Sequence, residues 1–227
     1  WTGGTVPGAD SLQFRDVHAF DARRAYVLSI GNGPQSRIYR TDDGGATWHA
    51  VNRGTRADFL PQTYPEAGQC VHKLVLHPAR PDRLYQQSHC GVYRSDDRGE
   101  NWTEITEGLP SDFGYALAVN PADPDVAYVV PEESSHMRTT VDGRLCVYRT
   151  RNAGASWEPL SGGLPQEHAY VSILREGLAA DPLDPCGLYV GTSSGHLFAS
   201  RDGGDHWELI AGYLPRILSV TAAVTEE

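Results

Sequence analysis

Two groups of residues in this chain have the types and spacing that could support chemistry. The stretch RSDDRGENW at 94–102 places two aspartates beside a serine and a glycine, and paired carboxylates can act as acid and base or bind a cation. Cys70 and His72 lie two residues apart, on one face of a predicted strand, and His89 and Cys90 end the next predicted strand. Two thiolates and two imidazoles form a ligand set that suits tetrahedral zinc.

The aspartate-rich stretch is one of four copies of a repeat. RTDDGGATW at 40–48, RTRNAGASW at 149–157 and ASRDGGDHW at 199–207 share its pattern, S/T-x-D/N-x-G-x-x-W. A catalytic acid is not expected four times at one period, and once as an asparagine. Short hydroxyl and carboxyl side chains bond to nearby backbone in tight turns, and glycine accepts a positive φ. The pattern therefore predicts a hairpin turn, and the repeated positions are Thr41, Asp43, Gly45, Trp48, Ser95, Asp97, Gly99, Trp102, Thr150, Asn152, Gly154, Trp157, Ser200, Asp202, Gly204 and Trp207.

This repeat resembles the Asp-box, or BNR repeat, of sialidase-like β-propellers. Each copy follows an apolar–aromatic pair, as in Ile38-Tyr39 and Val92-Tyr93. The resemblance implies that each box occupies the turn between the third and fourth strands of a blade, away from the ligand-binding face. Residues 12–48 resemble the repeat of the photosystem II assembly factor family, which is not catalytic. Residues 53–224 resemble bacterial BNR-repeat glycosyl hydrolase-like proteins, close to xyloglucanase and sortilin propellers.

The resemblance and the strand pattern together predict an all-β fold: a β-propeller of four-stranded antiparallel blades, four of them complete. A second marker agrees, because a proline stands seven residues before a tyrosine in three repeats, as in Pro78 and Tyr85. We expect blades at roughly 12–52, 69–108, 114–161 and 171–212, with split terminal strands at 1–7, where Trp1 takes the place of a box tryptophan, and at 216–224. A segment of a larger propeller is favoured over a complete small ring.

Composition narrows the function classes. The net charge is −10, from 29 acidic and 19 basic side chains, so the mean field repels a phosphate backbone and we expect no nucleic-acid partner. No apolar run approaches the roughly 18 residues of a membrane helix, and WTGGTVPGAD lacks the basic and apolar segments of a signal peptide. The compartment is not readable from the sequence. The four cysteines form no C-x-x-C pair, which excludes a zinc ribbon.

In such propellers ligands bind on the channel face, opposite the boxes, and this implies a set of candidate residues. A glycosidase needs two carboxyl groups, about 5–5.5 Å apart for retention or about 6.5–9.5 Å apart for inversion. The carboxylates that the resemblance places on this face are Asp112, Glu132, Glu133, Glu167 and Glu176. The candidate ligand-binding residues are Tyr64, His72, His89, Tyr115, His136, Arg138, His168, Tyr170 and Arg175.

Several alternatives stay open at this point. Cys70 and Cys90 could form a disulfide, could be ordinary buried cysteines, or could join the two histidines around a metal. We expect no metal and no cofactor. Sialidases hold their substrate with three arginines, whereas Arg138 and Arg175 are the only strong ones on this face. We therefore expect a non-catalytic binding or assembly module that presents its channel face to a protein or glycan. The alternative is a glycoside hydrolase-like enzyme that uses paired carboxylates.

Overall fold

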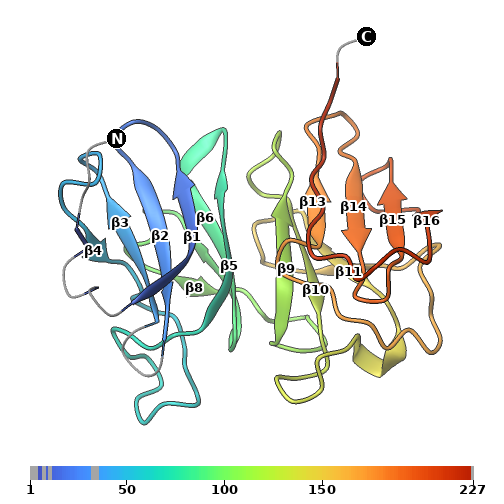
Figure 1. The fold of residues 1–227 in the computed structure, drawn as a ribbon, viewed down its shortest axis with the longest axis horizontal. Helices are drawn as coiled ribbons and strands as arrows, with labels where there is room; N and C mark the ends of the chain where they lie inside the picture. The colour runs from blue at the N-terminus through green and yellow to red at the C-terminus, as the bar shows by residue number, and fades with distance from the viewer. Residues whose placement is uncertain (1–4, 7–8, 10–11, 32–35, 226–227) are drawn as a thin grey trace. The chain divides into compact units, whose positions relative to one another are not determined.

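The computed structural model describes residues 5–6, 9, 12–31 and 36–225, and within them the fold is nearly all β (Figure 1). Its strands form four four-stranded antiparallel sheets in which sequential strands are neighbours. One 3₁₀ turn, at Val141–Gly143, interrupts the pattern. The predicted four-stranded blades are confirmed. Among the described residues, no helix is long and apolar enough to cross a membrane.

The chain divides into two compact units, Trp1–Glu104 and Ile105–Glu227. The first unit holds two sheets, with strands β1 (Gln13–Ala19), β2 (Ala25–Ile30), β3 (Arg37–Thr41), β4 (His49–Ala50), β5 (Val71–His77), β6 (Arg80–Ser88), β7 (Gly91–Ser95) and β8 (Thr103–Glu104). The second holds the other two, with strands β9 (Gly114–Val119), β10 (Ala127–Pro131), β11 (Val147–Thr150), β12 (Glu158–Leu160), β13 (Leu178–Ala180), β14 (Leu188–Gly191), β15 (Leu197–Ser200) and β16 (Glu208–Ala211).

Each unit has its own apolar core. In the first, Tyr26, Leu84 and Tyr93 are buried together with Trp102. The core of the second unit includes Tyr128 and other apolar side chains of the seven strands β9–β15. These strands are short and rich in β-branched and aromatic residues, and glycine and proline stand near their ends. Because these features and the alternation of apolar and polar residues are visible in the sequence, the strands could be predicted from it.

The predicted terminal strands have different outcomes. Most of the 1–7 segment, including Trp1, lies outside the described residues. Residues 216–224 form no strand in the structure: Ser219 makes one isolated parallel bridge with Glu176, and the Val220 amide donates to the Glu176 carbonyl over 2.7 Å. The Ile217 amide also donates to the Thr192 carbonyl over 3.3 Å, so the segment has the composition of a strand but bonds to separate pieces of backbone and forms no continuous ladder.

All four Asp-boxes close the turn between the third and fourth strands of a sheet with the same bonds. In the last box, the Ser200 hydroxyl donates to Asp202 over 2.8 Å and accepts from the Gly204 amide over 2.8 Å. The Asp202 carboxylate also accepts from the backbone and the ring of His206, over 2.9 and 2.7 Å. The box glycines have positive φ, for example 103° at Gly204, where a Cβ would be strained. In the structure these repeated residues hold the turn together through their own hydrogen bonds.

Box tryptophans also bond to backbone outside their own box, within the same unit. The Trp102 indole donates to the Val51 carbonyl over 3.0 Å, and the Trp157 indole donates to the Ile105 carbonyl over 2.7 Å. The aliphatic residue three positions after a box tryptophan packs on the glycine of the next box. A Cβ built on Gly99 would lie 3.3 Å from the Val51 side chain, so the absence of a side chain at this glycine is what allows the contact.

Buried arginines make a second link of the same kind. Arg40 on β3 donates to the Arg98 carbonyl, in the next box, over 2.9 Å. Arg149, at the equivalent position on β11, donates to the Gly203 carbonyl over 2.7 Å. Since each guanidinium reaches a backbone oxygen of the following sheet, the arginine fixes the position of one box turn against its neighbour in the same unit.

We expect the box carboxylate to matter for stability in a pH-dependent way. Although partial burial opposes the shift, hydrogen bonds from His206 and Ser200 lower the pKa of Asp202 from 3.8 to about 2. A depressed carboxyl pKa means that this stabilisation is complete above about pH 4 and is lost as the pH falls toward 2. Asp202→Ala should reduce the free energy of unfolding at pH 7 by about 1 kcal/mol, measured by urea denaturation.

The control for this change is Glu208→Ala, which removes an exposed carboxylate from β16 in the same hairpin. It should leave the unfolding free energy within about 0.5 kcal/mol of the parent. The difference between the parent and Asp202→Ala should shrink as the pH approaches 2. A difference that is constant between pH 7 and pH 2 would show that the carboxylate charge has no part in the effect.

Candidate functional site

In the second unit, part of the predicted site gathers around one cavity. The cavity has a volume of about 710 Å³ and lies at the end of the sheets opposite the box turns, which we call the box-distal end. Glu167, His168 and Tyr170 line it from the segment between β12 and β13. The other lining residues are Leu145, Gly163, Leu164, Pro165, Ala169, Val171, Thr192, Ser194, His196, Phe198 and Leu209.

Backbone bonds hold the loop that carries these residues. The Ala169 amide donates to the Gly143 carbonyl over 2.8 Å, and the Thr140 amide donates to the Val171 carbonyl over 2.9 Å. Tyr170 lies against Gly143, where a Cβ would come within 2.9 Å of the tyrosine ring. With 65% of its surface exposed, Tyr170 is both anchored and accessible, which suits a ring that contacts a ligand.

The opposite side of the cavity comes from the β14–β15 turn, which the sequence analysis did not select. His196 stacks on Phe198 with ring centroids 6.5 Å apart, and its Nδ1 lies 3.1 Å from the Ser194 hydroxyl. Tyr213, which is 97% exposed, lies 6.1 Å from the His196 ring. His196 could have been found from the sequence, because the turn between the second and third strands of a blade lies at the end opposite the Asp-box turn.

Glu132, a candidate catalytic acid, does not line the cavity. Its side chain is fully buried, and Oε1 accepts from the Ser172 hydroxyl over 2.6 Å and from the Ile173 amide over 3.1 Å. Oε2 has no hydrogen-bond partner among the described residues. Burial raises the pKa of Glu132 above its usual value, although these two bonds act in the opposite direction. In the structure this carboxyl joins the sheet β9–β12 to the segment before β13.

Substitutions at Glu132 should reveal its structural role through their effect on stability. Glu132→Gln retains an acceptor for Ser172 and Ile173 and removes a buried charge, so we expect unchanged or higher stability at pH 7. Glu132→Ala removes the acceptor of the buried Ile173 amide and of the half-buried Ser172 hydroxyl and should reduce the unfolding free energy by about 2–3 kcal/mol. Urea denaturation of both variants beside the parent measures the difference.

The pH profile provides a second check on Glu132. A carboxyl whose pKa is raised on folding loses stabilisation as the pH rises above 4.5, its ordinary value. The parent should lose stability over this range relative to Glu132→Gln, which has no proton to release. Parallel profiles for the two proteins would contradict the assignment.

The remaining candidates in the second unit are dispersed. Tyr115 is buried, and the Arg175 guanidinium lies 4.8 Å above its ring. Glu133 is exposed and accepts from the Asp142 amide over 3.1 Å. Three further candidates, all exposed, are on loops and are not among the residues that line the cavity: Asp112, His136 and Arg138.

In the first unit, three of the four predicted Cys and His residues come together. One ligand atom from each of Cys70, His72 and His89 lies within 4.8 Å of the others. Cys90 is not a member of this group, and among the described residues no disulfide joins it to Cys70. Adjacent residues in a turn point in different directions, and Cys90 is buried instead. Tyr64, on the preceding loop, is 62% exposed.

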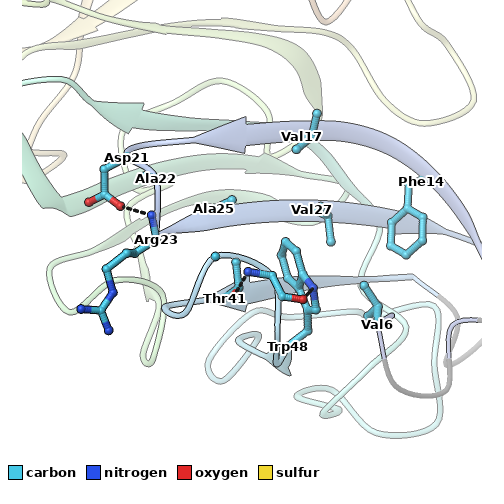
Figure 2. Close-up of a pocket in the computed structure, with 12 residues that line it drawn as sticks. Val6, Phe14, Val17, Asp21, Ala22, Arg23, Ala25, Val27, Thr41 and Trp48 are labelled. Carbon is cyan, nitrogen blue, oxygen red and sulfur yellow. Dashed lines mark hydrogen bonds between the residues drawn. The ribbon is translucent and has the colours of Figure 1, made fainter. Parts of the chain in front are cut away.

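A second pocket, of about 230 Å³, lies in the first unit beside the box of the first sheet. Figure 2 shows Val17 and Val27 on one side of it and Trp48 on the other, and Val6 also lines it. In the three other boxes an aliphatic side chain from the chain before the box lies in front of the box glycine, whereas among the described residues a Cβ on Gly45 would meet Trp48. The pocket thus lies at the position that a packing side chain occupies in the other boxes.

Comparison with known proteins supports the Asp-box turns and the propeller fold. Residues 39–50 match the family model described as BNR/Asp-box repeat. An ancestral GH74 enzyme superposes on 88% of this chain and 24% of its own, with a TM-score of 0.61 and 18% identity. The chain is built of Asp-box β-propeller blades. YCF48 from Cyanidioschyzon merolae superposes on 90% of this chain and 57% of its own, with a TM-score of 0.54 and 20% identity.

The curated relatives of this Asp-box chain include xyloglucanases. Xyloglucanase Xgh74A of Acetivibrio thermocellus is 26% identical over 179 residues, which is 73% of this chain and 19% of the relative. The xyloglucanase of Hypocrea jecorina is 24% identical over 200 residues, or 87% and 21%. The chain thus spans about a fifth of the length of these enzymes. Both expected resemblances, to glycosyl hydrolase-like propellers and to the photosystem II assembly factor propeller, are confirmed.

Proposed function

We propose that this chain is a non-catalytic binding module that takes an extended protein segment into the cavity beside Tyr170. The observation that carries the proposal is the lining. Eight of the 14 lining residues are leucine, proline, alanine, valine, phenylalanine or tyrosine, and Glu167 is the one carboxylate among the lining residues. A glycosidase of the usual type needs two carboxyl groups across the scissile bond, and Glu132 is buried in a structural bond.

The polar groups at the rim suit recognition of a peptide. His196 and Thr192 come from the β14–β15 turn, and Glu167 and His168 come from the opposite loop. Ligand sites commonly combine apolar walls with a few polar groups that set orientation. An apolar side chain of the partner would fill the cavity, while its backbone would meet the hydroxyl and imidazole groups of the rim.

A second candidate function, glycoside hydrolysis, is favoured by the similarity to xyloglucanases. In that case Glu167 is the candidate acid in the cavity. The exposed Tyr170 and Tyr213 could then stack on sugar rings, since aromatic faces present large apolar surfaces. Both candidates use the same cavity, so one set of variants distinguishes them.

The experiment probes the chain in parallel with an array of peptides that carry a central leucine or phenylalanine and with an array of plant and bacterial oligosaccharides. Peptide binding should fall at least tenfold in Tyr170→Ala. Tyr64→Ala is the matched control, because this tyrosine is equally exposed but belongs to the other unit. Release of sugar from xyloglucan that disappears in Glu167→Gln would replace the binding proposal with the enzymatic one.

A further inference from the structure

The group of Cys70, His72 and His89 in the first unit is the strongest unassigned site, and it goes beyond the proposed binding function. Its three ligand atoms converge within 4.8 Å. We propose that these three side chains bind a thiophilic transition-metal ion of the zinc class through one thiolate and two imidazoles. A fourth position of the tetrahedron would remain for water or for a group of a ligand.

Backbone geometry brings the three residues together from distant positions. β5 and β6 pair with Val71 opposite Ser88, and the His89 amide donates to the Cys70 carbonyl over 2.8 Å. His89 occupies the tight turn between β6 and β7, at the box-distal end of this sheet. The contact between Cys70 and His89 is therefore set by the sheet itself and does not depend on a mobile loop.

An irregularity in the same sheet directs the second histidine. The β5–β6 register shifts between Val71 and Lys73, so His72 falls at a bulge. Bulges change the direction of a side chain and are frequent beside functional sites. Here the His72 and His89 rings meet edge to face with centroids 5.5 Å apart, and His72 is only 3% exposed. One ligand is thus held by burial, while Cys70 and His89 are half-buried.

The distances are close to those that a metal requires. Zinc lies about 2.3 Å from sulfur and about 2.0–2.1 Å from nitrogen, which places the ligand atoms of a tetrahedral site roughly 3.5 Å apart. Starting from 4.8 Å or less, small rotations of Cys70 and His89 would close the remaining gap.

Ligand chemistry restricts the metal. A thiolate with two imidazoles selects zinc or copper, whereas magnesium, calcium and manganese prefer oxygen ligands. The phenyl ring of Phe59 lies edge-on to His89 with centroids 5.2 Å apart and covers part of the approach. Such a partly shielded site with three protein ligands matches the open type of metal centre more closely than a closed structural one.

The test uses metal ions alone as probes. The chain is purified without a histidine tag, its bound metals are measured by plasma mass spectrometry, and the chelator-treated chain is titrated with Zn²⁺, Co²⁺ and Cu²⁺. We expect one equivalent of metal and, with Co²⁺, the near-ultraviolet charge-transfer absorption of a thiolate ligand. Preference for Zn²⁺ or for Cu²⁺ would support the site and identify its ion.

Variants connect the signal to these residues. Cys70→Ser should abolish the charge-transfer absorption and weaken binding at least tenfold, and His89→Gln should weaken it by a similar factor. Cys146→Ser, a half-buried cysteine of the second unit, is the matched control and should behave as the parent. Circular dichroism and thermal melting without metal establish that each variant is folded. Absence of metal binding by the folded parent, or unchanged binding by Cys70→Ser, would overturn the proposal.

Discussion

Gly163→Ala should reduce the free energy of unfolding by about 4 kcal/mol, one of the largest effects expected from adding a single methyl group to this chain. Two costs add at this position. Gly163 has φ of 91°, a conformation that costs an L-residue about 1–2 kcal/mol. In addition, a Cβ there would overlap the carbonyl oxygen of Trp207 in the next sheet of the same unit, and the backbone would have to shift.

The chain contains a matched control for this prediction. Gly108 occupies the equivalent position after the preceding box and has the same φ of 91°, and a Cβ built on it would have no atom of the described residues within 4 Å. Gly108→Ala should therefore carry the conformational cost alone, about 1–2 kcal/mol. Urea denaturation of both variants isolates the effect of the Trp207 contact. Equal losses in the two variants would mean that this contact contributes nothing.

The fourth repeat supports the same interpretation. Tyr213 stands where the other repeats have this glycine, and it adopts φ of 58° while being 97% exposed. A side chain is thus tolerated at this position where the structure leaves space around it. What requires glycine at 163 is the next sheet, and not the turn alone.

Arg149→Met should reduce the unfolding free energy by about 3 kcal/mol, because the guanidinium makes several charge-assisted hydrogen bonds at once. Arg149 is buried and donates to the Gly203 carbonyl and to the Asp205 carboxylate, each over 2.7 Å, and to Glu158 over 2.5 Å. Methionine retains most of the apolar stem, so the loss reports the polar contacts. In Arg149→Met, the carboxylates of Asp205 and Glu158 can form hydrogen bonds with water instead, but the Gly203 carbonyl loses this donor.

Arg151→Met is the control for Arg149→Met. Arg151 shares the Glu158 partner over 2.9 Å, but its side chain is 59% exposed, and exposed ion pairs contribute only about 0–1 kcal/mol. Thermal and urea denaturation at two salt concentrations should show a large, salt-insensitive loss for Arg149→Met and a small, salt-sensitive loss for Arg151→Met. Similar losses would indicate that the hydrogen bond to the Gly203 carbonyl contributes little to the free energy of unfolding.

The Asp-box turns were predictable because their interactions are local. The Ser200 hydroxyl, the Asp202 carboxylate and the Gly204 amide lie within five residues of one another, and the same types recur in all four copies. Strand type and order followed from short-range alternation and from turn residues. These features depend on neighbours in the chain, which a repeat pattern displays directly.

The candidate site was only partly predictable. Cys70, His72 and His89 could be expected to converge from strand pairing, but the exclusion of Cys90 depends on how one turn directs two adjacent side chains. Tyr170 was a candidate because of the loop on which it lies. His196 becomes a candidate because the structure shows that this loop and the β14–β15 turn line one cavity. The contribution of each residue was decided by side-chain direction, which spacing alone does not encode.

By itself, the sequence determined the Asp-box repeats, the all-β class and the four-stranded blades, because hydrogen bonds over two to four residues and a strand period of two specify them locally. The tertiary structure alone decided that Glu132 is a buried acceptor for Ser172, forty positions away in the chain, and not an exposed acid. The sequence does not distinguish a glutamate in one role from a glutamate in the other. Its chemistry depends on burial and on partners that folding brings from distant segments.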